Sequence, residues 1–224
     1  MLKGDSMLDW QQIDTVLLDM DGTLLDLHFD NHFWLEYVPA KYAEKHQLSI
    51  DEAKQHIYPK FEQMMGKLEW YCLDYWNQEL DLNMVELKQE IKHLITLRPG
   101  VDEFLRALHQ SDKQVVLITN AHQDSLSLKL ERVELAQYFD WLISSHEFGY
   151  PKEEQLFWQG LSQRINFDGK RTLFIDDSLP ILRSAKKYGI KHLLAIKQPD
   201  SKKAIRDTEE FEAVANYHDL LPVL

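Results

Sequence analysis

The stretch Asp14-Thr15-Val16-Leu17-Leu18-Asp19-Met20-Asp21-Gly22-Thr23-Leu24-Leu25 decides how the rest of the chain is interpreted. Its apolar run from Val16 to Leu18 predicts a short buried strand, because the run is long enough for a sheet and too short for a helix. Asp19 and Asp21 follow this run, and Gly22 then allows a sharp turn. Ligands of open α/β sheets bind at the carboxyl ends of strands, and residues two apart on a strand share a face. Both carboxylates are therefore expected in one pocket.

A pair of carboxylates this close suits phosphoryl transfer. One carboxylate can attack phosphorus, while the other passes a proton to the leaving group and later takes one from water. Two like charges at this separation need a cation, and Mg²⁺ is the natural one because it prefers oxygen ligands. An Asp-Gly turn after a strand is also common turn chemistry, so the pair alone leaves both interpretations open.

The composition indicates an ordinary globular protein. With 224 residues the chain has room for one large domain, or for one domain with a small insertion. The residues are 44% hydrophobic and 28% charged, which is typical of soluble proteins. The formal net charge of -12 disfavours binding to nucleic acid or to an anionic membrane, because both reward a basic face. A phosphorylated metabolite remains compatible with this charge, since a local Mg²⁺ and a lysine can reverse its sign within a pocket.

The sequence has no feature of export. Cys72 is the only cysteine, so a disulfide within the chain is excluded. Met1 to Trp10 lacks the apolar core of a signal peptide. No apolar run approaches the ~18 residues that a membrane span needs. We therefore expect a cytoplasmic protein without a membrane partner.

Residues 28–97 contain no convincing strand and read as an inserted helical bundle. Ser49 and Glu52 have the spacing of a capping box, and Asn83 is a candidate N-cap, so both positions predict the start of a helix. Pro39 and Pro59 are expected to end or kink helices. So long a helical segment cannot be a simple crossover between two strands. We expect it to form a helical cap, with residues 1–27 and 98–224 forming the core.

From Arg98 onward the pattern alternates between buried strands and amphipathic helices. Strands are expected at 114–118, 141–144, 172–175 and 192–196, and helices at 101–110, 124–133, 152–164 and 179–188. Strands that alternate with helices of this length imply a parallel sheet with right-handed crossovers. The predicted fold class is therefore α/β.

Every polar residue that suits chemistry falls at or just beyond the end of a predicted strand. Asp19 and Asp21 follow the first strand, Thr119 and Asn120 the second, Lys152 the third, and Asp176 and Asp177 the fourth. The loops at this edge of a parallel sheet converge on one crevice. Each residue alone has an ordinary explanation, as a helix cap or a solvated lysine at a helix start. Their joint occurrence favours a single site.

The residue types in this set complement one another. The Thr119 hydroxyl and the Asn120 amide can donate to phosphoryl oxygens. Lys152 can hold the nucleophile and the phosphate together while negative charge shifts between them. Asp176 offers a hard oxygen ligand to Mg²⁺, and Asp177 can hold a metal-bound water or Lys152.

Four motifs resemble, in order and spacing, those of the haloacid dehalogenase-like (HAD) superfamily: Asp19-Met20-Asp21-Gly22-Thr23-Leu24, Thr119-Asn120, Lys152, and Phe174-Ile175-Asp176-Asp177. The resemblance implies a three-layer Rossmann-like sheet with strand order 3-2-1-4-5 and a mobile cap between the first two motifs. It also implies Asp19 as nucleophile and Mg²⁺ ligand, and Asp176 as a further ligand. Asp21 would be the general acid/base and would lend Mg²⁺ its backbone carbonyl. Many members carry another acid four or five residues after the first aspartate of the last motif, where this chain has Pro180 and Ile181, so the role of Asp177 stays open.

The resemblance extends to a substrate class. Within the superfamily, Asp21 favours phosphatases over dehalogenases, which attack carbon and need no proton donor there. Four segments resemble those of bacterial HAD 5′-nucleotidases that act on the purine nucleotides GMP and IMP: 29–34, 70–76, 119–122 and 148–153. This implies hydrolysis of a nucleoside 5′-monophosphate to nucleoside and phosphate.

Other interpretations stay open beside this one. The chain could be a phosphatase or phosphomutase for a sugar phosphate or a small phosphoglycolate-like acid. It could also be a binding protein without turnover, which is disfavoured because no chemical position is missing. The aromatic residues of the insertion could stack on a base. Trp34 with Tyr37, and Leu73 with Trp76, have the helical spacing of a buried stripe, which favours a role in the cap's own core.

Overall fold

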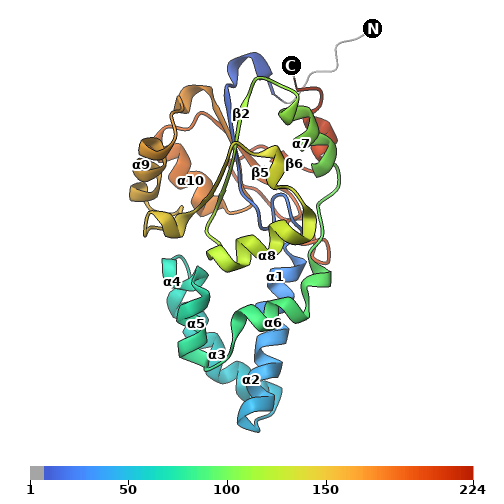
Figure 1. Ribbon diagram of the computed structural model, residues 1–224, viewed down its shortest axis with the longest axis vertical. Helices are drawn as coiled ribbons and strands as arrows, with labels where there is room; N and C mark the ends of the chain where they lie inside the picture. Colours follow the sequence, from blue (N-terminus) through green and yellow to red (C-terminus); the bar gives the residue numbers. More distant parts are fainter. Residues whose placement is uncertain (1–7, 224) are drawn as a thin grey trace.

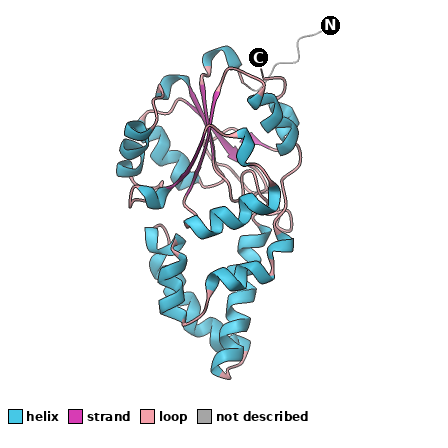
Figure 2. Cartoon of the chain, viewed as in Figure 1, coloured by secondary structure: helices cyan, strands magenta, loops and turns pink. Residues whose placement is uncertain are grey.

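The computed structural model describes residues 8–223 and has two parts, a sheet covered by helices and a helical part that extends from one end of it (Figure 1, Figure 2). All strands are parallel, in the order β3-β2-β1-β4-β5-β6. Their bounds are β1 Thr15–Leu18, β2 Gln114–Thr119, β3 Trp141–Ser144, β4 Thr172–Ile175, β5 His192–Ile196 and β6 Ala213–Val214. The predicted order 3-2-1-4-5 is confirmed. β6 adds a sixth strand that the sequence analysis missed, since two residues are too few to carry a pattern.

The first strand lies in the middle of the sheet because both of its faces are apolar. Leu17 stands opposite Val116 of β2 and Phe174 of β4, and it contributes to the core on one face. Val16 and Leu18 contribute to the core on the other face. Strands buried on both faces read as continuous apolar runs, as this one does.

Helices cover both faces and make the predicted three layers. They are α7 Val101–His109, α8 Gln123–Val133, α9 Gln155–Arg164 and α10 Leu179–Tyr188. α9 and α10 pack on one face, whereas α7 lies on the other (Figure 1). α9 begins at Gln155 and not at Lys152 as predicted, because the chain after Pro151 forms a turn first. Short 3₁₀ helices occupy Trp10–Gln12, Ala136–Tyr138, Ser145–Glu147, Gly169–Arg171 and Tyr217–Leu220.

The chain between the first two strands is helical, as predicted. It forms α1 His28–His32, a π-helical segment Phe33–Tyr37, α2 Val38–His46, α3 Ile50–Met64, α4 Leu68–Tyr71, α5 Leu73–Leu80, α6 Met84–Glu90 and a 3₁₀ helix Lys92–Leu94. Ser49 and Glu52 form the expected capping box, with Ser49 N donating to Glu52 Oε2 at 2.9 Å. Pro39 lies in the first turn of α2, and Pro59 lies inside α3 without ending it. Asn83 is the N-cap of α6, as expected, and its side chain accepts a hydrogen bond from Glu86 N.

The segments that lead into and out of this helical part run side by side. Asp26 N donates to Thr96 O at 2.9 Å, and Arg98 N donates to Leu24 O at 2.9 Å. A single connected core cluster joins Phe29 and Phe33 of the insertion to Val16 and Leu18 of the sheet. The helical part therefore packs on the sheet part through apolar side chains as well as through the paired connections.

The C-terminal segment packs against the N-terminal part of the chain. The Tyr217 hydroxyl donates to the backbone carbonyl of Thr23 at 3.0 Å. Trp10 Nε1 donates to Leu220 O at 3.0 Å. The segment from Met1 to Trp10, which was not expected to be a signal peptide, lies mostly outside the described residues. Within residues 8–223, no helix combines the length and the apolar character that crossing a bilayer requires.

Candidate active site

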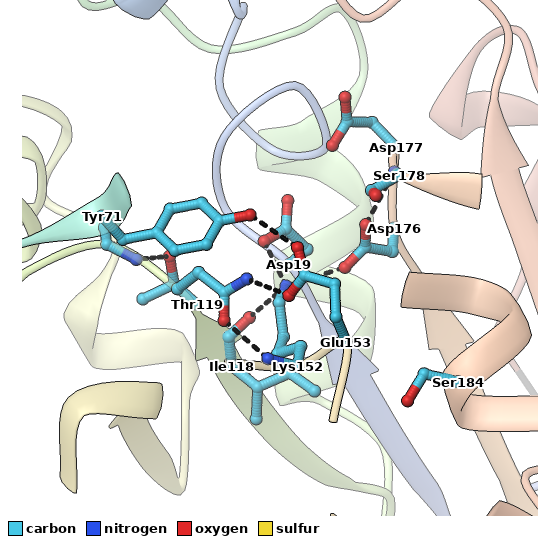
Figure 3. A network of polar contacts seen from close by, with 12 residues as sticks. Asp19, Tyr71, Ile118, Thr119, Lys152, Glu153, Asp176, Asp177, Ser178 and Ser184 are labelled. Atoms are coloured by element: carbon cyan, nitrogen blue, oxygen red, sulfur yellow. Dashed lines mark hydrogen bonds and ion pairs between the residues drawn. The ribbon is translucent and has the colours of Figure 1, made fainter. Parts of the chain in front are cut away.

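The carboxyl ends of the central strands bring most of the predicted residues together (Figure 3). The residues that share this place are Asp19 after β1, Thr119 and Asn120 at the end of β2, Lys152 after β3, and Asp176 and Asp177 after β4. All of them except Asp177 are buried, with exposed fractions of 0–6%. The topology thus joins residues from most of the chain's length, as the sequence analysis expected.

Lys152 is the centre of the site. Its Nζ donates to Asp19 Oδ1 at 2.6 Å, to Asp176 Oδ2 at 2.7 Å and to the backbone carbonyl of Ile118 at 3.2 Å. Burial alone would lower the pKa of Lys152, but Asp176 and Asp19 raise it above its usual value. The lysine is therefore a fixed positive charge between two carboxylates.

Three carboxylates form a group that suits a metal ion. Oxygens of Asp19, Asp176 and Asp177 lie within 4.8 Å of one another. Burial raises the pKa of Asp19 to about 6 against the opposing charge of Lys152. Burial, together with Asp176 and Asp19, raises the pKa of Asp177 well above its usual value. Within residues 8–223, Asp19 Oδ2 is buried without a hydrogen-bond partner. Crowded, desolvated carboxylates of this kind fit a hard divalent cation such as Mg²⁺.

Gly22 allows the first loop to approach this acidic group. Its φ is +81°, a value that other residues rarely adopt. A Cβ at this position would lie 2.8 Å from Asp177 Cγ. Asp177 therefore lies against the turn that follows Asp19. It makes no hydrogen bond to Lys152 within residues 8–223, so of the two partners that the sequence analysis offered for Asp177 a metal-bound water is the one that stays a prediction.

Asp21 lies apart from the carboxylate group and pairs with a lysine that the sequence analysis missed. Lys129 Nζ of α8 donates to Asp21 Oδ1 at 2.7 Å. The same ammonium contacts both carboxylate oxygens of Asp30. Burial and the neighbouring Asp30 raise the pKa of Asp21 to about 6, with Lys129 opposing the rise. A lysine within a mixed helical pattern carries no sequence signal of burial, so nothing marked Lys129 in advance.

Thr119 and Asn120 form the wall next to Lys152. The Thr119 hydroxyl accepts a hydrogen bond from Ala121 N at 3.0 Å, and its own proton is left for a ligand. Asn120 Oδ1 accepts from Lys152 N at 2.9 Å, while Nδ2 donates to Glu153 Oε2 at 2.9 Å. The amide nitrogen that was expected to face a phosphate is thus bonded to Glu153, and Asn120 fixes the backbone that carries Lys152.

The helical insertion contributes Tyr71 to the same wall. Its hydroxyl donates to Glu153 Oε1 at 2.7 Å, so Glu153 joins Tyr71 to Asn120 (Figure 3). Burial raises the pKa of Tyr71 above its usual value, and Glu153 adds to the rise, so the hydroxyl stays protonated. Neither Tyr71 nor Glu153 was assigned a role from the sequence, because each stands in a loop or a short helix without a pattern.

A cavity of about 330 Å³ lies between the sheet and the insertion, at the low end of the usual size for small-molecule sites. Its floor contains the polar residues described above, including Asp19, Lys152 and Asp176. Its other wall contains Trp34, Trp70 and Lys88 of the insertion. Trp34 also packs on Trp70 and Trp76, with ring centroids 5.6 and 5.9 Å away. Trp76 is fully buried and so belongs to the core of the insertion, whereas Trp34 both packs on other aromatic rings and lines the cavity.

Comparison with known proteins agrees with this geometry. The family model of the haloacid dehalogenase-like hydrolases matches residues 13–189. The GMP/IMP nucleotidase YrfG of Escherichia coli is 42% identical over 96% of this chain and 97% of its own. A phosphoglycolate phosphatase of Pseudomonas fluorescens is 23% identical over 79% of this chain and 66% of its own. The crystal structure of a HAD phosphatase from Thermococcus onnurineus superposes with a TM-score of 0.76 at 22% identity, covering 93% of this chain and 96% of that one. The chain therefore belongs to the haloacid dehalogenase-like hydrolase family and is a phosphoric monoester hydrolase.

Proposed function

We propose that this enzyme is a Mg²⁺-dependent phosphatase that hydrolyses purine nucleoside 5′-monophosphates, GMP and IMP, to nucleoside and phosphate. The observation that carries the proposal is Lys152 held between Asp19 and Asp176 at the floor of a cavity whose opposite wall is aromatic. The floor offers the charges that a phosphate needs, and the wall offers surfaces for a planar base. The similarity to the GMP/IMP nucleotidase supports this choice of substrate.

The proposed reaction has two steps. Asp19 attacks phosphorus, so that a bond forms between its carboxylate oxygen and phosphorus while the bond from phosphorus to the 5′-oxygen breaks. Asp21 gives its proton to that departing oxygen, which leaves as the nucleoside hydroxyl. Water then attacks the phosphorus of the aspartyl-phosphate and gives a proton to Asp21. The products are inorganic phosphate and the original Asp19 carboxylate.

Other residues of the site hold the phosphate during both steps. Lys152 stays beside Asp19 and compensates the negative charge that develops on the phosphoryl oxygens. The Thr119 hydroxyl donates its proton to one of these oxygens. Asn120 and Glu153 keep the Lys152 backbone and Tyr71 in place.

Mg²⁺ would be held by the carboxylates of Asp19 and Asp176 and the backbone carbonyl of Asp21, with Asp177 beside it. When bound, the ion supplies positive charge that neutralises the carboxylates and the phosphate and thereby lets an anion approach an anion. Asp19 Oδ2 and the raised pKa values of Asp19 and Asp177 support this assignment, since these groups need a cation to be ionised together.

We assign residues 28–97 as the substrate-selecting cap, joined to the core by the paired connections at 24–26 and 96–98. Trp34, Trp70 and Tyr71 line the cavity on the cap side. In this arrangement the phosphate would bind at Lys152 and the base at this wall, with the ribose between them. A small acid such as phosphoglycolate would leave the aromatic wall without a partner.

A panel of phosphate esters tests the substrate assignment. GMP, IMP, AMP, UMP, phosphoglycolate and hexose phosphates are incubated with the enzyme and Mg²⁺, and released phosphate is measured. We expect the highest kcat/KM for GMP and IMP. A higher kcat/KM for phosphoglycolate or a hexose phosphate would contradict the nucleotide assignment, and release of an isomer in place of phosphate would indicate a mutase.

Replacing Trp34 with leucine tests the role of the aromatic wall. Stacking of a base on an aromatic side chain is worth about 1–3 kcal/mol, so kcat/KM for GMP should fall by about 5- to 150-fold in Trp34→Leu. Hydrolysis of a small acyclic phosphate should change much less. Equal losses for both substrates would show that Trp34 only supports the packing of the cap. Point variants suit this test better than deletion of the cap, because the cap and the sheet share one apolar core.

Mg²⁺ should stabilise the fold as well as support turnover. Binding relieves repulsion among Asp19, Asp176 and Asp177, so the free energy of unfolding should rise by about 2.7 kcal/mol at 100 times the dissociation constant. A Mg²⁺ titration followed by thermal unfolding checks this, with chelator as the reference. Asp176→Asn should lose most of the increase. The Mg²⁺ assignment is wrong if wild-type protein shows no increase and releases phosphate equally well in chelator.

A further inference from the structure

We propose that Lys129 is a positioning residue for Asp21, through which it controls proton transfer to the leaving group. The proposal rests on the proposed function for the role of Asp21. Lys129 lies on α8, outside every motif identified from the sequence, and its side chain is 1% exposed. Its Nζ donates to Asp21 Oδ1 at 2.7 Å.

Lys129 is itself held in place. Asp30 of α1 accepts two further hydrogen bonds from its Nζ, at 2.9 Å to Oδ1 and 2.8 Å to Oδ2. Lys88 of α6 donates to the same Asp30 Oδ1 at 3.0 Å. The four side chains form a buried row in which carboxyl groups and ammonium groups alternate, Asp21–Lys129–Asp30–Lys88. A buried lysine with carboxylates on two sides has little freedom to move, because leaving either would strand an unpaired charge.

The hydrogen bond from Lys129 determines which carboxylate oxygen of Asp21 is available to a ligand. Oδ1 is engaged by Lys129, whereas Oδ2 has no hydrogen-bond partner within residues 8–223. Asp21 also lines the cavity that contains Asp19. A general acid must reach the oxygen that it protonates within about 2.6–3.2 Å, so a carboxylate that rotates freely would spend little time in reach. Lys129 restricts the rotation of the Asp21 carboxyl group, so that Oδ2 stays free to carry the proton for the leaving group.

The row of residues from Asp21 to Lys88 also connects Asp21 to the cap. Lys88 Nζ lies 4.3 Å from the ring centroid of Phe33 and 4.9 Å from that of Phe29, so its charge is held within aromatic rings of the insertion. α6 of the insertion packs beside α8 of the sheet part (Figure 1). Lys129, which holds Asp21, is therefore itself held by Asp30, a residue of the insertion that also pairs with Lys88.

The test compares two leaving groups. The 5′-hydroxyl of a nucleoside needs a proton as it leaves, whereas p-nitrophenolate leaves without one. In Lys129→Met, kcat for GMP should fall about 100-fold, as for a misplaced catalytic group, and kcat for p-nitrophenyl phosphate should fall much less. Lys129→Arg keeps the charge and should recover most of the GMP activity. Lys45→Met, which removes an exposed lysine paired with Asp81, is the matched control and should change neither substrate.

A double-mutant cycle separates positioning from general support of the fold. If Lys129 acts through Asp21, adding Lys129→Met to Asp21→Asn should lower kcat for GMP by little beyond Asp21→Asn alone. The Mg²⁺-dependent rise in Tm should be kept in Lys129→Met, because the carboxylate group with Asp19 is intact. Equal losses for both leaving groups, or additive losses in the cycle, would overturn the proposal.

Asp30→Asn keeps the proposal testable if Lys129→Met does not fold. It loosens the hold on Lys129 and should cause the same preferential loss with GMP, of about tenfold; an equal loss with both esters would overturn the proposal. If wild-type enzyme does not hydrolyse GMP, the nucleotide assignment fails by itself. The same variants are then measured with the best alkyl phosphate of the panel, which tests Lys129 independently.

Discussion

Asp19→Asn should abolish phosphate release from every ester, lowering kcat by about 10⁴-fold or more, as expected for loss of a nucleophile. An amide oxygen attacks phosphorus poorly, and Asp176, the other carboxylate beside Lys152 Nζ, is assigned to Mg²⁺ in this mechanism. The variant should also fail to retain radiolabelled phosphate when turnover is quenched, whereas wild-type enzyme should carry a hydroxylamine-sensitive label.

The fold of Asp19→Asn should persist, which makes the loss interpretable. Asparagine has nearly the same shape, its carbonyl can still accept from Lys152, and Asp176 remains as the second partner of the lysine. Far-UV circular dichroism and thermal unfolding provide the control. A folded variant that releases phosphate at the wild-type rate would remove Asp19 from the mechanism.

Lys152→Met should be the most damaging of these substitutions for stability, and it should also lower activity. Removing the ammonium leaves Asp19 and Asp176 buried without their shared partner, which costs about 3–5 kcal/mol when a buried pair is broken. Loss of one fixed donor to the phosphoryl oxygens should lower kcat by about 10²–10³-fold. Chemical denaturation and phosphate release measure the two effects.

Mg²⁺ provides an internal check on this prediction. The ion should restore part of the lost stability of Lys152→Met, because it neutralises the same carboxylates. Lys45→Met breaks an exposed pair and should cost at most about 1 kcal/mol. Equal stability of Lys152→Met and Lys45→Met would contradict the electrostatic account of the site.

The sequence predicted those parts of the site that depend on strand ends. Asp19, Thr119 and Asp176 directly follow or end apolar runs. In a parallel sheet the carboxyl ends of all strands lie at the same edge, so these residues must lie near one another. The family resemblance supplied their roles, and the matches to HAD hydrolases and to a GMP/IMP nucleotidase confirm that recognition. The individual roles of the residues and the domain boundaries at 27 and 98 stay predictions.

The parts that could not be predicted depend on contacts between segments distant in sequence. Lys129 and Lys88 are charged residues on helices, and charge predicts exposure unless a partner is known. Their partner Asp30 is just as ordinary by itself. Tyr71 reaches Glu153 only because α4 of the insertion lies beside the loop between β3 and α9, an arrangement that no local pattern encodes. Likewise, the two-residue strand β6 forms because β5 offers an open edge.

The hydrogen bond from Tyr217 to the Thr23 carbonyl has a consequence for biosynthesis. The turn beside the proposed nucleophile is translated 194 residues before Tyr217, which is one of its supports. A nascent chain still inside the ribosome at residue 210 would have all the acids and lysines of the site but not this support. The enzyme should therefore gain its full activity only after Tyr217 has emerged from the exit tunnel.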